Sequence, residues 1–137
     1  MKIGTLLIIV LSALIIVTLL LIISKFQQIP KSSFTEIYFN DIENIPKIAK
    51  INQPIIFSFS VSNKQNKNYN YEYELMLKIG DNESIIKRDN FNLNKNEIKN
   101  IIENLTIKEN FEKALISVKL IDTNQEIHFW VTNINKN

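Results

Sequence analysis

The sequence predicts a mainly β protein, an antiparallel β-sandwich of about seven strands preceded by one N-terminal transmembrane helix. Three observations carry this prediction. An uncharged apolar run opens the 137-residue chain, apolar and polar residues then alternate with a period of two, and short polar turns separate the alternating runs. No later segment is long enough to supply the helices that connect parallel strands, so we expect antiparallel pairing.

The N-terminal run, Ile3 to Ile23, contains no charged residue. As an α-helix it would be roughly 31 Å long, which matches the hydrocarbon thickness of a bilayer. A cleaved signal peptide has a shorter apolar stretch and a small-residue cleavage site, and no such site or lipobox cysteine follows this run. We therefore expect an uncleaved signal anchor over residues 1–25.

The segment that follows, residues 26–33, is expected to be a short polar stalk. Pro30 disfavours continuation of the helix into it. Such a stalk reaches at most roughly 28 Å when fully extended. The domain predicted over residues 34–137 would therefore work close to the membrane surface.

The position of the lysines gives only a weak indication of orientation, because Lys2 precedes the apolar run while Lys25 and Lys31 follow it. Two glycosylation sequons, at Asn82 and Asn104, have meaning only outside the cytoplasm, although an Asn-rich chain produces such triplets by chance. We expect a single-pass protein of the cell membrane with its C-terminal domain extracytoplasmic.

The strands follow in order along the domain, each marked by alternation or by its place after the stalk. They are expected at residues 34–39, 55–61, 69–79, 114–120 and 127–131. Polar turns are expected at residues 63–68, 80–82 and 122–124. In the last strand Ile127, Phe129 and Val131 should face the core, and His128, Trp130 and Thr132 should face outward.

Residues 96–107 fit two patterns. Ile98, Ile101, Ile102 and Leu105 recur at helical spacing. A strand would instead place Glu103 among inward-facing apolar residues. The period alone favours a helix, but a sandwich needs a further strand to complete its second sheet, so we predict a strand here.

Several motifs together resemble a known family. They are Phe34-Thr35-Glu36-Ile37-Tyr38, Phe59-Ser60-Val61-Ser62-Asn63, Asn70-Tyr71-Glu72-Tyr73-Glu74-Leu75 and Ile127-His128-Phe129-Trp130-Val131. Their order and spacing over residues 34–132 resemble an archaeal family of membrane-associated domains of unknown function, DUF1616. The resemblance implies an immunoglobulin-like β-sandwich displayed outside an archaeal cell, and it implies no known activity. Asn residues stand where the family often has glycines in its strand connections.

Composition excludes several classes of function. Lys and Arg number 16 against 14 for Asp and Glu, and this balance argues against nucleic-acid binding. The absence of cysteine excludes disulfides, a thiol nucleophile and thiolate metal sites.

The candidate catalytic residues are few. His128 is the only histidine and has no identifiable carboxylate partner. Glu72 and Glu74 share one strand face and are expected to be solvated charges rather than a glycosidase pair. The turn at residues 81–83 offers too few oxygens for calcium. We therefore predict no catalytic residue, no metal site and no cofactor.

Two aromatic groups remain as candidates for contact. Tyr69, Tyr71 and Tyr73 are expected to run from an exposed loop end into the core rather than to form a binding surface. His128 and Trp130 are the candidate contact patch, with packing under a covered face as the alternative.

These observations favour a non-enzymatic interaction or accessory module of an archaeal cell envelope or membrane complex. Its expected partners are the membrane, through residues 3–23, and another envelope or membrane protein, with no small-molecule substrate. The alternative is a pilus- or archaellum-associated, stator-like component, although Lys2-Ile3-Gly4 is a poor prepilin cleavage site. A hydrolase is less favoured because no nucleophile–base pair is found.

Overall fold

The structure is a computed structural model that describes residues 3–27 and 33–134, and within the N-terminal helix it describes the exposure of Gly4 and of residues 11–22. The chain divides into two compact units, Met1–Lys31 and Ser32–Asn137. Each unit is described by itself. Most of the predicted stalk, residues 28–32, and the last three residues of the predicted domain lie outside the described residues.

The first unit contains the helix α1, Ile3–Gln27. The hydroxyl of Thr18 donates to the carbonyl oxygens of Ile15 and Leu14, at 2.8 and 3.1 Å. Within the described part of the chain, no helix combines the length and the apolar character that a membrane crossing requires. The signal anchor therefore stays a prediction.

The second unit is a β-sandwich of eight strands, one more than predicted. The strands are β1 (Thr35–Phe39), β2 (Ile48–Ala49), β3 (Pro54–Asn63), β4 (Tyr69–Ile79), β5 (Asn82–Leu93), β6 (Ile98–Thr106), β7 (Lys113–Leu120) and β8 (Gln125–Asn133). The prediction missed β2 and β5. The former is only two residues long, and the latter is exposed over most of its length, so neither produces a clear alternation.

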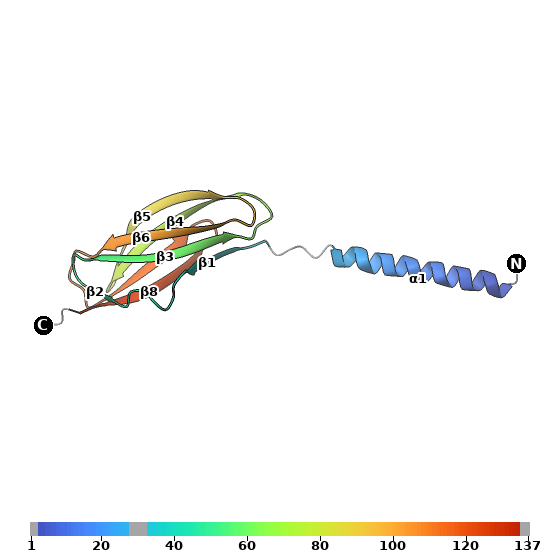
Figure 1. Cartoon of the computed structure of the whole chain (residues 1–137), viewed down its shortest axis with the longest axis horizontal. Helices are drawn as coiled ribbons and strands as arrows, with labels where there is room; N and C mark the ends of the chain where they lie inside the picture. The colour runs from blue at the N-terminus through green and yellow to red at the C-terminus, as the bar shows by residue number, and fades with distance from the viewer. Residues whose placement is uncertain (1–2, 28–32, 135–137) are drawn as a thin grey trace. The chain divides into compact units, whose positions relative to one another are not determined.

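The strands form two sheets (Figure 1). One sheet has the order β1-β3-β6, and the other has the order β2-β8-β7-β4-β5. All pairs are antiparallel as predicted except β2 and β8, which are parallel over two residues. Because β2 follows β1 along the chain but joins the other sheet, the segment between them crosses from one sheet to the other.

The core lies between the sheets and is built from the alternate residues that the sequence predicted to face inward. On β3 these are Ile55, Phe57, Phe59 and Val61, and on β7 they are Ala114, Ile116, Val118 and Leu120. The ring of Phe129 meets the ring of Phe57 edge-on at 5.0 Å. Phe129 and Val131 are buried, Ile127 is half-buried, and His128, Trp130 and Thr132 are exposed, so the predicted faces of β8 are confirmed.

Three asparagines occupy turn positions that favour glycine. Asn52, Asn96 and Asn124 have φ angles of 62°, 63° and 51°, in the left-handed region that Asn tolerates better than most residues. Gly80, with φ 59°, forms the predicted turn between β4 and β5. Asparagine therefore substitutes for glycine in this fold without loss of tight turns.

Residues 98–106 form a strand, which confirms the prediction made against the helical period. Glu103 faces inward between Ile101 and Leu105 as that prediction required, and only 3% of its surface is exposed. Ile98 and Ile102 point outward and are exposed.

Candidate interaction surface

The predicted contact patch lies on the outer face of the five-stranded sheet. His128 pairs across strands with Ser117, and Trp130 pairs with Leu115. The ammonium group of Lys113 lies 4.4 Å from the centroid of the Trp130 ring, which is a favourable cation–π distance. Trp130 is 47% exposed, so the patch is accessible, but the Lys113 ammonium from the same sheet already lies over the indole ring.

The paired glutamates do not face each other across a cleft. Arg88 on β5 binds both, with its Nε 3.0 Å from Glu74 and 3.4 Å from Glu72. This contact raises the pKa of the Arg88 guanidinium. Glu74 is buried, contrary to the expected solvated charge, because the Arg88 side chain lies against it.

The turn considered for calcium remains a simple hairpin connection. Asp81 belongs to the turn, whereas Asn82 and Glu83 begin β5 and are exposed. Across the described residues, no group of three or more acidic or histidine side chains lies close enough to hold a metal ion. The sequon residues Asn82 and Asn104 are both exposed, and their glycosylation stays a prediction.

A buried polar cluster links the two sheets and was not found from the sequence. Glu103 of β6 accepts hydrogen bonds from the hydroxyl of Tyr73 on β4 and from the ammonium of Lys87 on β5, the latter at 2.9 Å. Burial, together with the bond to Glu103, raises the pKa of Tyr73 to about 12, and the bond to Glu103 also raises the pKa of Lys87. The sequence signal that could have revealed this cluster was Glu103, an acidic residue at an inward-facing position of a predicted strand. Every polar partner in this cluster is satisfied internally, so we interpret it as a structural link between sheets.

The tyrosine stripe follows the expected course from loop to core. Tyr69 is half-buried, while Tyr71 and Tyr73 are almost completely buried. Their hydroxyls bind Thr35 and Glu103 respectively. These rings therefore belong to the core and do not form a binding surface.

Large apolar side chains gather on the outer face of the three-stranded sheet and on the loop after β1. We call this surface the isoleucine face; its members and exposed fractions are Tyr38 (42%), Ile42 (71%), Ile56 (57%), Ile98 (53%) and Ile102 (71%). In the strands these residues alternate with the inward-facing core residues. The sequence analysis did not identify this face. Its signal was the presence of isoleucines on both faces of β3 and β6.

A shallow pocket of about 260 Å³ opens on the isoleucine face. It is lined by Asp41, Asn44, Ile45, Pro46, Ile56, Phe57, Ser58 and Ile102. The loop between β1 and β2 supplies one wall, and neighbouring strands β3 and β6 supply the other. The main chain and side chain of Asn44 both donate to the carboxylate of Asp41, at 3.3 and 2.8 Å, which holds this carboxylate in place.

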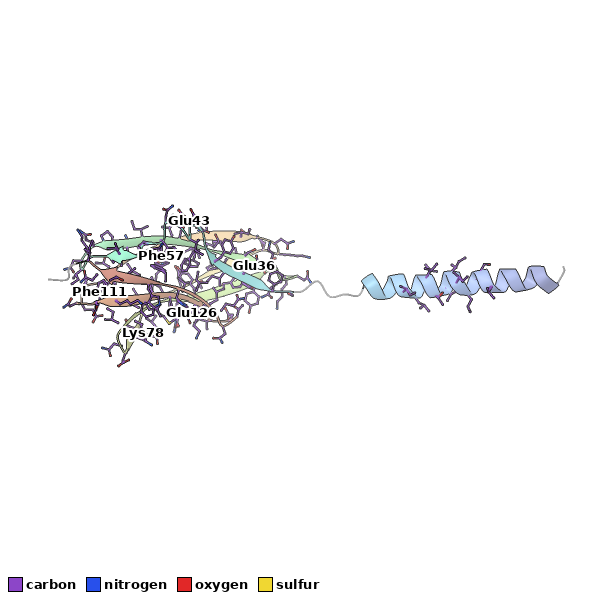
Figure 2. All side chains as sticks on the ribbon, turned by 90° about the horizontal axis from the view of Figure 1, so that it is seen from below. Glu36, Glu43, Phe57, Lys78, Phe111 and Glu126 are labelled. Atoms are coloured by element: carbon purple, nitrogen blue, oxygen red, sulfur yellow. The ribbon has the colours of Figure 1, made fainter. Side chains whose placement is uncertain are left out.

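Acidic side chains accompany the isoleucine face. Glu36 is exposed on β1, and Asp41 and Glu43 are exposed in the loop that follows. None of the three forms an ion pair with a described residue. In Figure 2 Glu43 lies on the side of the three-stranded sheet, opposite to Lys78.

Comparison with solved structures identifies the fold. A β-glucosidase from Listeria innocua matches with a TM-score of 0.61 at 13% identity, over 74% of this chain and 16% of its own. The CARDB domain of a Pyrococcus furiosus protein, in complex with di-metal ions, matches with a TM-score of 0.51 at 16% identity, over 72% of this chain and 89% of its own. The Pseudomonas fluorescens alkylpurine DNA glycosylase AlkC matches with a TM-score of 0.57 at 10% identity, over 73% of this chain and 31% of its own.

These likenesses show an immunoglobulin-like β-sandwich and nothing about activity, since the identities are low. The chain spans only a small part of the β-glucosidase that it resembles. No family model matches the sequence, and no curated protein matches it. The resemblance to DUF1616 stays a prediction.

Proposed function

We propose that this protein is a non-enzymatic interaction module, held at the membrane by its N-terminal segment, whose β-sandwich contacts another envelope or membrane protein. The observation that carries the proposal is the isoleucine face. Ile42, in the loop after β1, and Ile102, which lines the pocket from β6, are each 71% exposed, and the other side of the three-stranded sheet is a well-filled core. Several large apolar residues exposed on one face of a sheet are typical of protein interaction sites.

The membrane attachment is part of the same proposal. It is supported by the uncharged run from Ile3 to Ile23 and by the helical conformation of that run in α1. The hydroxyl of Thr18 donates to carbonyl oxygens of the preceding turn, so its hydrogen bond is satisfied within the helix, as an apolar environment requires. An extracytoplasmic location is proposed from the sequons and from the resemblance to DUF1616.

Site-specific photocrosslinking of the full chain in its native membranes tests the proposal. A photoreactive amino acid replaces Ile102 on the isoleucine face, or Ile85 as a matched control, since Ile85 is 54% exposed on the other sheet. We expect one discrete crosslinked product from position 102 and none from position 85. Equal, diffuse crosslinking from both positions, or none from either, would reject the isoleucine face as the contact surface.

A further inference from the structure

We infer that the isoleucine face binds a segment of a partner protein that presents a lysine or arginine beside apolar residues. The aliphatic part of the basic side chain enters the pocket, and its charged end meets the carboxylate of Asp41. This inference rests on the proposed function and specifies the chemistry of the partner.

The size and lining of the pocket favour one long side chain as the occupant. Its volume of about 260 Å³ lies below the range of about 300–1,000 Å³ that is usual for small-molecule sites. Ile45, Pro46 and Ile102 offer apolar contact to a methylene chain. Lysine and arginine bury their stems against such surfaces while their charged ends stay at a polar edge.

The charge on this face selects a cation. Asp41 lines the pocket, and its carboxylate is oriented by Asn44. A purely apolar occupant would remove this charged carboxylate from water with only the neutral donors of Asn44 as partners, which is unfavourable. A basic side chain supplies the opposite charge through a charge-assisted hydrogen bond.

The neighbouring charges point to the same partner. Glu36 and Glu43 add two carboxylates to the face, and neither forms an ion pair with any residue that the structure describes. Two cations accompany them: Lys47, exposed in the same loop, and Lys99 on β6, whose ammonium lies 4.9 Å from the Phe91 ring of the other sheet. Acidic residues therefore outnumber basic ones on the strands and the loop of this face. The face thus attracts cations and repels acidic segments.

A second copy of this chain is a poor occupant for the same reason. Symmetric pairing of two isoleucine faces would place the carboxylates of Glu36, Asp41 and Glu43 from both copies in one interface. Like charges brought together in this way oppose association. A basic, apolar segment of a different protein carries no such penalty.

Selection from a random peptide library tests this inference. The full chain is immobilised in lipid nanodiscs, and displayed nonapeptides are selected against it, with empty nanodiscs as the counter-selection. We expect the enriched peptides to share a lysine or arginine next to an apolar residue. Enrichment of acidic or uncharged peptides, or no enrichment over empty nanodiscs, would overturn the inference.

A double-mutant cycle then locates the contact. The strongest peptide is compared with a version in which citrulline, a neutral residue of the same shape, replaces arginine (a selected lysine is first changed to arginine). Binding is measured to the native chain, to Asp41→Asn and to the control Glu126→Gln, whose carboxylate is exposed on the other sheet. We expect Asp41→Asn alone, or citrulline alone, to weaken binding about tenfold. The two changes together should weaken binding little further than either one. The control Glu126→Gln should leave binding unchanged. Additive losses, or an equal loss with Glu126→Gln, would overturn the contact with Asp41.

The photocrosslinking and the peptide selection test different claims, so a failure of one can be told from a failure of the other. Discrete crosslinking from position 102 combined with failure of the peptide selection would retain the isoleucine face as an interaction surface and reject the basic partner. Absence of crosslinking would reject the proposed function itself. The isoleucine methyl NMR spectrum of each variant confirms that the fold is retained, which is expected because Asp41 and Glu126 are both exposed.

Discussion

Glu103 shows how an acidic residue is accommodated in the core between the two sheets. An ionised carboxylate in such a position is costly unless hydrogen bonds and an opposite charge compensate it. The structure provides both, through Tyr73 and through Lys87, whose side chain is 43% exposed. The ammonium group can therefore reach water and the buried carboxylate at once, which lowers the cost of burying the pair.

Replacement of Glu103 by leucine should expose the dependence of Tyr73 on this carboxylate. The Glu103→Leu variant leaves the proton of the buried Tyr73 hydroxyl without an acceptor, since Lys87, 3.3 Å away, can only donate to it, and this costs about 1–3 kcal/mol. The double variant with Tyr73→Phe removes both polar groups and should recover most of that loss. Urea denaturation of residues 32–137 measures the effect. If the double variant is less stable than Glu103→Leu, the hydroxyl and the carboxylate do not act as a pair.

The same cluster predicts a loss of stability at alkaline pH. The pKa of Tyr73 is raised from 10.0 to about 12 on folding, so the native state holds the phenolic proton at pH values where the unfolded state has released it. Stability from this group is complete below pH 10 and is lost as the pH rises to about 12, by about 2–3 kcal/mol. The raised pKa of Lys87 acts in the same direction.

Thermal or urea unfolding between pH 9 and about 12 tests this dependence. Tyr73→Phe should show a smaller loss of stability over that interval than the native sequence. Parallel curves for the two proteins would show that Tyr73 is not the titrating group.

At the scale of the element, β8 provides the sharpest test of side-chain orientation. The Phe129 ring packs against Phe39 and Phe57 at centroid distances of 5.4 and 5.0 Å, whereas His128 is exposed. Phe129→Ala should cost about 3–5 kcal/mol and nearly unfold the domain. His128→Ala should cost about 1 kcal/mol or less. A larger loss for His128→Ala in urea denaturation would contradict the orientation of this strand.

The strand β6 explains why sequence periodicity was ambiguous. Its inward residues Ile101 and Leu105 and its outward residues Ile98 and Ile102 together produce a helical spacing. The outward isoleucines therefore concealed the strand and marked the isoleucine face at the same time. A strand that carries apolar residues on both sides loses the simple alternation from which strands are recognised.

The fold was largely predictable because alternate apolar residues are buried on β4, β7 and β8, and on β8 the residues between them are exposed. The edge strand β5 was not predictable, because its first nine residues are all exposed and show no alternation. The predicted patch at His128 and Trp130 is accessible, but the pocket is not predictable from local pattern. It forms only where the loop containing Asp41 meets strands β3 and β6, which are distant in sequence.

At the scale of the whole molecule, the proposed anchor predicts how the protein fractionates. If residues 3–23 span the bilayer, the full chain should stay with membranes through extraction by high salt and by alkaline carbonate. Protease added outside spheroplasts should digest the domain, because we propose an extracytoplasmic location. Release by salt, or digestion only after lysis, would contradict the anchor or the orientation respectively.

The pairing of β1 with β3 has a mechanical consequence for a tethered domain. Residue 34 leads into one end of β1, and Ile56 of the pocket lies on β3 beyond the other end of their pairing, so tension between a tether and a partner bound at Ile56 would pass from β1 to β3. The antiparallel bonds over Thr35–Phe39 then carry the load together, in shear, rather than opening one by one as in peeling. Gln125 also donates to the carbonyl of Thr35, at 2.9 Å, so the point where force enters is fastened to both sheets.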